Sequence, residues 1–156
     1  MAVEVEGLDD LNRQLRKLAK ESPRAVERAA FAGGLKIQGY AQDNVPVERG
    51  NLRASAYTQR SSGGLVRGSA SGLDPSKNFP DPAATPPLTV EVGFSAKYAI
   101  YVHENMEQTL KGEPRPSGLG TYWNPGGPKF LERAVNENGD EIVDIVEAYL
   151  EKAFNQ

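Results

Sequence analysis

The sequence has 156 residues, of which 38% are hydrophobic and 25% charged, a composition typical of one soluble globular domain, here residues 1–156. Its formal net charge of −3 argues against a general polyanion-binding protein. The lack of cysteine and the single histidine exclude disulfide frameworks, thiolate chemistry and multi-histidine metal centres, so no metal and no cofactor are expected. No apolar run approaches the roughly 20 residues that cross a bilayer, and the acidic N-terminus lacks a secretory signal, so the chain is expected in the cytoplasm where it is made.

The first third of the chain predicts two helices. Leucines recur at spacings of three and four, which is typical of one stripe of an amphipathic helix: Leu8, Leu11, Leu15 and Leu18. Ser22-Pro23 reads as an N-cap followed by proline in the first turn, and a second helix is expected from there to about Asn44. Gly33-Gly34 predicts a local weakness or kink in that helix, in preference to a close approach of another backbone.

The middle of the chain predicts two strands and a long loop between them. A turn over residues 46–52 leads into a strand at about residues 53–60, where small and polar side chains alternate. Residues 61–87 lose all periodicity and are rich in Gly, Ser and Pro, so they are expected to form an arm or hairpin extension that a partner orders. Residues 88–94 alternate again, as in a half-buried strand.

The last third predicts a short element, a second loop and a terminal helical region. Residues 97–104 are dense in aromatic and apolar side chains and favour a helical turn packed on the sheet. Residues 105–127 form the second Gly- and Pro-rich loop, and a helix opens at Gly127-Pro128 with a break or bend at Asn138-Gly139. Segregated helices and strands predict the α+β class: a small antiparallel sheet packed against N-terminal and C-terminal helices, with two long extended loops.

The candidates for catalysis are few. His103-Glu104 is the sharpest cluster, but neighbouring residues do not face each other on a helix or a strand, so a surface or interface histidine is the preferred interpretation. The glycine pairs match no phosphate-loop or dinucleotide pattern. We therefore expect no enzyme, and an enzyme that uses His103 is the least favoured class of function.

Four arginines fall in a stretch with little opposing charge and suggest a possible nucleic-acid groove, with Tyr57 as a stacking platform: Arg49, Arg53, Arg60 and Arg67. The negative net charge argues against strong binding that is independent of sequence. A DNA-binding accessory protein is therefore the second class of function to be weighed.

An ordered set of motifs carries a family resemblance. The chain has Gly7-Leu8-Asp9-Asp10-Leu11, then Pro46-Val47-Glu48-Arg49-Gly50-Asn51-Leu52, then Tyr98-Ala99-Ile100-Tyr101-Val102-His103-Glu104, then Pro128-Lys129-Phe130-Leu131. Order and relative positions resemble the tail-component or neck family of long-tailed, lambdoid-type bacteriophages over nearly the whole chain. Departures are Glu48-Arg49, where the family has Asp-Thr, and His103 before Glu104, followed by residues 105–127 in place of a Gly-Thr turn.

The resemblance implies a structural virion protein, a neck or tail-completion subunit at the head–tail junction. It implies a homo-oligomeric ring, six- or twelve-fold, between head-closure or connector proteins and tail-terminator or tail-tube proteins, around the channel for genomic DNA. A tail-terminator or minor capsid component is the alternative within this class. The two loops would be the assembly arms, and three aromatics are candidate interface anchors, with core packing as the competing interpretation: Phe79, Tyr122 and Trp123.

Overall fold

The computed structural model describes residues 8–18, 20, 22–46, 50–61, 63–68, 79–106, 113, 114, 118 and 127–155. The first helix, α1 (Leu8–Leu18), and the long helix α2 (Pro23–Asn44) begin as the leucine spacing and Ser22-Pro23 predict. The Ser22 side chain, however, makes no capping hydrogen bond. The C-terminal helices α5 (Phe130–Glu137) and α6 (Gly139–Phe154) are separated at Asn138, which confirms the predicted break.

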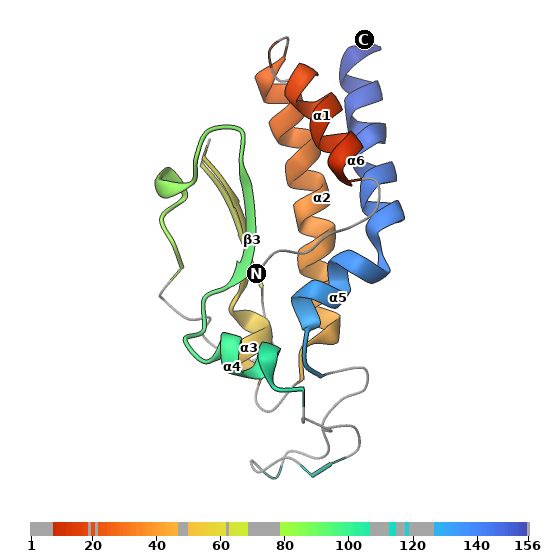
Figure 1. The fold of residues 1–156 in the computed structure, drawn as a ribbon. Helices are drawn as coiled ribbons and strands as arrows, with labels where there is room; N and C mark the ends of the chain where they lie inside the picture. The colour runs from red at the N-terminus through yellow and green to blue at the C-terminus, as the bar shows by residue number, and fades with distance from the viewer. Residues whose placement is uncertain are drawn as a thin grey trace.

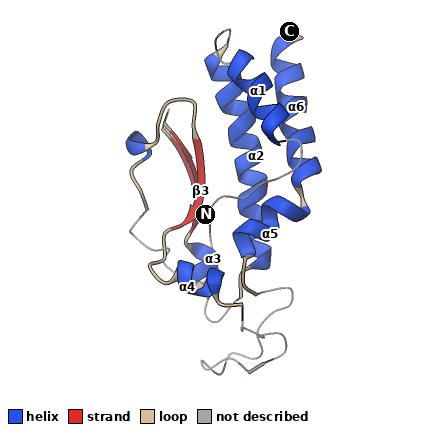
Figure 2. Ribbon diagram, viewed as in Figure 1, coloured by secondary structure: helices blue, strands red, loops and turns tan. Residues whose placement is uncertain are grey.

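The described strands form one antiparallel sheet of order β2-β1-β3, made of β1 (Ala56–Arg60), β2 (Gly64–Arg67) and β3 (Val90–Phe94). In the central strand, Thr58 is paired with Val66 on one side and with Val92 on the other. Figure 1 shows the sheet on one side of α2 and α6 on the other, with α1 lying across them. Helices and strands are segregated, as Figure 2 shows, and the α+β prediction is confirmed.

Strand β1 starts later than predicted, because residues 51–54 form the short helix α3 (Asn51–Ala54). Gly50 takes a positive φ of 88°, and its carbonyl accepts a hydrogen bond from the Ala54 N–H at 2.9 Å, so the chain makes one helical turn before it extends. The Ser55 hydroxyl then donates to the Leu52 carbonyl at 2.7 Å. The apparent alternation from residue 53 therefore spans two elements.

The predicted loop 61–87 contains two regular elements. Its first part turns at Gly63, where φ is 94°, and returns as β2, so that the loop opens as a hairpin extension of the sheet. The 3-10 helix η1 (Pro82–Ala84) follows later, with the Asp81 carboxylate accepting from the Ala83 N–H at 2.9 Å. Residues 69–78 lie outside the described part of the chain. Four residues of β2 are too few for periodicity to stand out.

Both faces of β1 are covered. On one face, the Thr58 hydroxyl donates to the Gln38 side-chain oxygen of α2 at 2.6 Å. On the other face, the Gln59 amide donates to the Thr85 hydroxyl at 2.9 Å, beside η1. Thr58 and Gln59 are therefore both buried, and the polar half of the alternation does not face solvent.

The weakness or kink expected at Gly33-Gly34 does not interrupt α2, which runs as one helix from Pro23 to Asn44. A Cβ atom on Gly33 would lie 2.8 Å from Val146 Cγ2 of α6, and one on Gly34 would lie 2.9 Å from Val90 Cγ1 of β3. Consecutive residues on a helix point about 100° apart, so the two glycines admit neighbours on two different sides. They mark close packing within the fold, and the groups that approach them are side chains of α6, β1 and β3 and not another backbone.

Two buried apolar clusters lie along α2. The upper cluster joins α1, α2 and α6: Leu11, Val26, Ala29, Val146 and Leu150. The lower cluster joins the end of α2 to α3, the short helix α4 (Ala99–Glu104) and α5: Val45, Leu52, Ala99 and Phe130. The helical turn predicted for residues 97–104 is confirmed as α4. None of the helices in the described part of the chain is long and apolar enough to span a membrane.

Candidate interaction surfaces

His103 and Glu104 do contact each other, contrary to the expectation from their adjacent positions. His103 is 4% exposed, and its Nδ1 lies 2.6 Å from Glu104 Oε1. The Glu132 backbone N–H donates to His103 Nε2 at 3.4 Å, so the Nδ1 atom carries the proton that is donated to Glu104. The ring also packs edge-on against Phe130, with centroids 4.9 Å apart. His103 is therefore a buried contact between α4 and α5 and not a surface histidine.

Lys129 completes this contact. Its Nζ donates to Glu104 Oε2 at 2.6 Å, and its backbone N–H donates to the His103 carbonyl at 2.7 Å. Hydrogen bonds to Lys129 first, and to His103 second, hold the pKa of Glu104 below its ordinary value. The backbone bond also means that the second loop leaves and returns at neighbouring points, beside α4.

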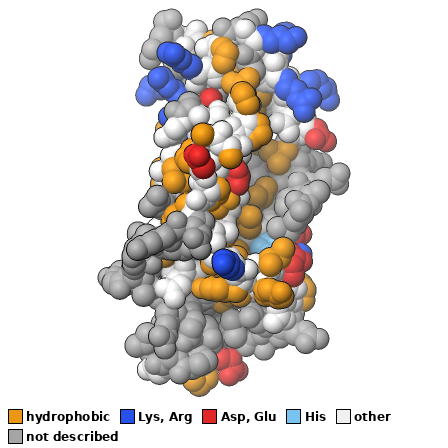
Figure 3. Space-filling model, turned by 90° about the vertical axis from the view of Figure 1, so that its left-hand side faces the viewer, with side chains coloured by type: hydrophobic (Ala, Val, Ile, Leu, Met, Phe, Trp, Pro, Cys, Tyr) orange, Lys and Arg blue, Asp and Glu red, His pale blue; other side chains and the backbone are white. Residues whose placement is uncertain are grey.

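The outward side of α4 carries the most exposed aromatic side chain of the described residues. Tyr101 is 78% exposed and Ile100 is 66% exposed, and Tyr98 and Met106 at the two ends of the helix are exposed as well. We call these four residues the α4 patch. Figure 3 shows hydrophobic side chains gathered on the lower part of this face, where α4 lies. Exposed apolar side chains that lie close together form a candidate interaction surface.

The α4 patch was not predicted from the sequence, although residues 97–104 carried a signal for it. A helix of six residues can bury one face, and Ala99 and His103 occupy that face. Tyr98, Ile100 and Tyr101 add more large apolar side chains than one face can hold. An excess of this kind points to a second, unpartnered surface.

The arginine stretch does not form one groove. The Arg53 guanidinium lies 3.1 Å from Asp43, near the end of α2, whereas Arg60 lies 3.7 Å from Glu27, near its start. Those two carboxylates are sixteen residues apart on α2, which corresponds to about 24 Å along the helix axis. Arg49 and the side chain of Arg67 lie outside the described residues.

Tyr57 is not available as a stacking platform. It is buried, its hydroxyl donates to Glu91 Oε1 at 2.7 Å, and burial with that hydrogen bond raises its pKa. Its ring packs edge-on against Phe79, with centroids 6.0 Å apart. Phe79, a candidate interface anchor, is thus half-buried against its own sheet, while Tyr122 and Trp123 lie outside the described residues.

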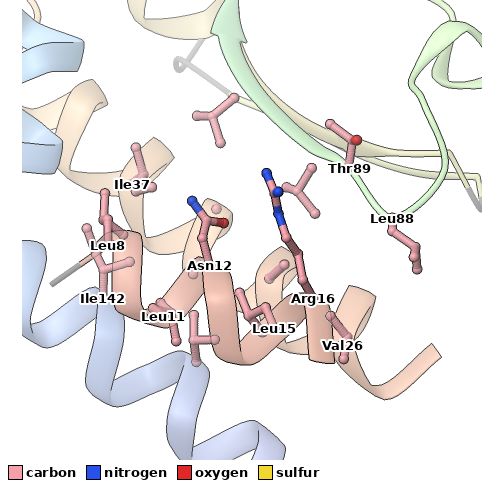
Figure 4. Close-up of a pocket in the computed structure, with 16 residues that line it drawn as sticks. Leu8, Leu11, Asn12, Leu15, Arg16, Val26, Ile37, Leu88, Thr89 and Ile142 are labelled. Carbon is pink, nitrogen blue, oxygen red and sulfur yellow. The ribbon is translucent and has the colours of Figure 1, made fainter. Parts of the chain in front are cut away.

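An apolar groove of about 550 Å³ lies between α1, α2, α6 and β3. Its floor includes Gly33 and Gly34, and Val90 forms part of the opposite wall. Figure 4 shows Asn12 and Arg16 of α1 pointing across it towards the strand. The described residues that line it include no carboxylate and no histidine. Among the described residues, no group of three or more His, Cys, Asp or Glu side chains is placed to hold a metal ion.

Comparison with known protein families identifies a match over the first two thirds of the chain. The model of the HK97-gp10-like family, described as "Bacteriophage HK97-gp10, putative tail-component", matches residues 9–103, which is more than half of the chain. No curated protein and no solved structure matches. The matched span runs from α1 to the buried His103 in α4. It includes three residues of the α4 patch, Tyr98, Ile100 and Tyr101.

Proposed function

Because this chain belongs to the HK97-gp10-like family of bacteriophage tail components, we propose that it is a neck or tail-completion subunit of the head–tail junction. In this role it forms a ring between the head connector and the tail, around the channel for the genome. The protein acts by assembly with other virion proteins and not by catalysis. The observation that carries this proposal is the α4 patch, which gives a tail component a place to bind its neighbours.

The α4 patch suits an interface because it is apolar, aromatic and rigidly held. Tyrosine and methionine are enriched in the buried centres of interfaces, and tyrosine often carries much of the binding energy. The inner side of α4 is fixed by the contacts of His103 and Lys129, so little conformational freedom is lost when a partner binds. In a closed ring the same contact repeats at every subunit boundary.

The second loop belongs to the same proposed interface. Met106, in the patch, lies at the start of residues 105–127, and Gly127 returns the chain by donating its N–H to the Asn44 carbonyl at 3.1 Å. We propose that this loop, with Tyr122 and Trp123, extends the contact surface that α4 begins. Residues 61–87 are proposed as the second arm.

Substitution of the patch tests the assembly role. The double variant Ile100→Ser and Tyr101→Ser should abolish incorporation into particles, and it should shift purified protein to the monomer in light scattering after size-exclusion chromatography. The control is Tyr149→Ser on α6, because Tyr149 is 54% exposed and lies outside the patch. Circular dichroism should show that both variants remain folded. Assembly of the double variant at the level of wild type would contradict the proposal.

Cryo-electron microscopy of purified virions tests the position in the particle. We expect density for this chain as a ring between the head and the tail. Density at the far end of the tail or in the capsid shell would favour the terminator or minor capsid alternative. Absence of the chain from the neck and tail would contradict the proposed function.

A further inference from the structure

A small pocket near the start of α2 is lined by three arginines and one glutamate. Its volume is about 320 Å³, and its lining consists of Arg24, Glu27 and Arg28 of α2 with Arg60 at the end of β1. Three guanidinium groups against one carboxylate leave the pocket with a positive charge. The sequence places Arg60 far from the other two, and the packing of β1 on α2 brings them together.

Arg60 is held in place before any ligand binds. Its guanidinium lies over the Phe31 ring, 4.7 Å from the centroid, and its Nε is 3.7 Å from Glu27 Oε1. A Cβ on Gly64 would lie 2.7 Å from that Nε, so glycine at this position leaves room for the side chain. The Nε atom is buried and has no hydrogen-bond partner in the described part of the chain. An arginine that is already held in one position loses little conformational freedom when its guanidinium binds an anion.

Arg24 and Arg28 add two more cationic side chains to the pocket. They are four residues apart on α2, which places them one above the other on the same face. Both are exposed, and neither makes an ion pair or hydrogen bond with the described residues. Like charges at this spacing weaken a helix slightly, so the stability of α2 does not account for the pair.

The pocket lies at a basic end of the molecule. Further exposed cationic side chains lie on α1 and in the turn after it: Arg13, which forms an ion pair with Asp10, and Arg16, Lys17 and Lys20. Figure 3 shows Lys and Arg at the end where α1 and α2 meet, on both sides of the view. The net charge of −3 is therefore unevenly distributed over the molecule, with cationic side chains collected around the start of α2. A surface that extends past one pocket suits a polyanion better than a single small anion.

We propose that the Arg24–Arg28–Arg60 pocket binds a backbone phosphate of duplex DNA. The guanidinium fork matches phosphate oxygens in geometry as well as charge. Contacts of this kind carry no base specificity, which suits a protein that meets any sequence of a genome. The inference goes beyond the proposed function, because ring assembly requires no DNA contact.

The test measures binding of a short fluorescein-labelled DNA duplex to the full chain by anisotropy, between about 50 and about 200 mM salt. Arg24→Gln with Arg28→Gln should weaken binding at every salt concentration. It should also reduce the slope of log Kd against log salt by about 1, because the contact to one phosphate is removed. The control is Lys97→Gln with Arg133→Gln, which removes the same charge near α4 and α5 and should leave the slope unchanged.

Several results would overturn the inference. One is no binding of the duplex by wild type at the lowest salt, and another is an equal loss in both double variants, which would mean a general charge effect. Inorganic phosphate, titrated alone by calorimetry, should bind far more weakly than the duplex; equal affinity would make this a site for free anions. If the pocket variant keeps DNA binding but loses self-association, the pocket serves carboxylates of a protein partner.

Discussion

Adjacent glycines in α2 are the residues on which the layered packing depends most directly. Gly33 is closed in by α6, and Gly34 is closed in by β1 and β3, where Thr58 Cγ2 would lie 3.0 Å from an added Cβ. The cost of glycine in a helix interior, about 1 kcal/mol relative to alanine, is offset by this close approach. A third glycine in the same helix, Gly39, has nothing within 4 Å of the position that an added Cβ would take, and it makes a natural control.

We expect Gly34→Ala to lower the free energy of unfolding by about 1 to 3 kcal/mol, because the methyl group would overpack against two strands. In contrast, Gly39→Ala should raise it by about 0.5 to 1 kcal/mol, since only the helix propensity changes. Urea denaturation of both variants at neutral pH gives the comparison. If the two substitutions shift stability by the same amount and in the same direction, the glycines do not differ in packing.

Single residues also show why the candidate site could not be predicted in full. The sequence grouped Arg49, Arg53, Arg60 and Arg67 because they are near one another in the chain, whereas the fold pairs Arg60 with Arg24 and Arg28. Such a grouping depends on how β1 packs against α2, which no local pattern contains. His103 and Glu104 illustrate a related limit, since their contact arises at the end of a short helix where the regular geometry stops.

Among the elements, the connection between α4 and α5 is expected to depend on pH. The pKa of Glu104 is lowered, chiefly by the hydrogen bond from Lys129, so the folded state favours the ionised carboxylate. The resulting stabilisation is present above the unfolded pKa, near 4.5, and is lost as the pH falls through the lower folded value. The pKa of Glu141 of α6, which accepts hydrogen bonds from Tyr40 and Lys36 of α2, is lowered in the same way.

Glu104→Gln should therefore destabilise the protein at neutral pH, and its difference from wild type should shrink as the solution is acidified below about pH 4. Chemical denaturation across this range measures the effect. Glu147→Gln serves as the control, because Glu147 is an exposed carboxylate of α6 without a cation partner among the described residues. A difference between Glu104→Gln and wild type that stays constant with pH would contradict the assignment.

Helices could be predicted from the sequence where apolar residues recur at regular spacing over several turns. The leucine spacing predicts α1 and the apolar stripe of residues 142–154 predicts α6, because each pattern is long enough to define one apolar face. The proline predicts where α2 begins. Helix α3 and strand β2 have four residues each, which is too short for a periodic pattern of apolar residues to be recognised. In β1 the expected alternation of exposure fails because α2 and the η1 segment cover opposite faces.

At the scale of the whole molecule, α2 links the two apolar clusters. Val26 lies in the upper cluster, and Val45, directly after the helix, lies in the lower one. A helix that takes part in both cannot lose its packing at one end without weakening the other. We therefore propose that the described elements unfold as one cooperative unit, as the single-domain expectation requires.

Val26→Ala tests this cooperativity. The substitution should cost about 2 kcal/mol in the upper cluster, and hydrogen exchange should show the same loss of protection for the slowest amides of α5, in the lower cluster. Transitions followed by circular dichroism and by exchange should coincide. Loss of protection confined to α1 and α6 would mean that the clusters unfold separately.

The glycine pair in α2 restricts which substitutions the family can accept at positions 33 and 34. A side chain larger than hydrogen at position 33 requires space that Val146 now fills, so an alanine there is tolerated only if position 146 becomes smaller. The same holds for position 34 with Val90. Among relatives in other phages, these positions should drift as coupled pairs, and independent variation should be rare. We therefore expect the spacing of α2 from α6 and β3 to stay constant among relatives while the residues at these positions change together.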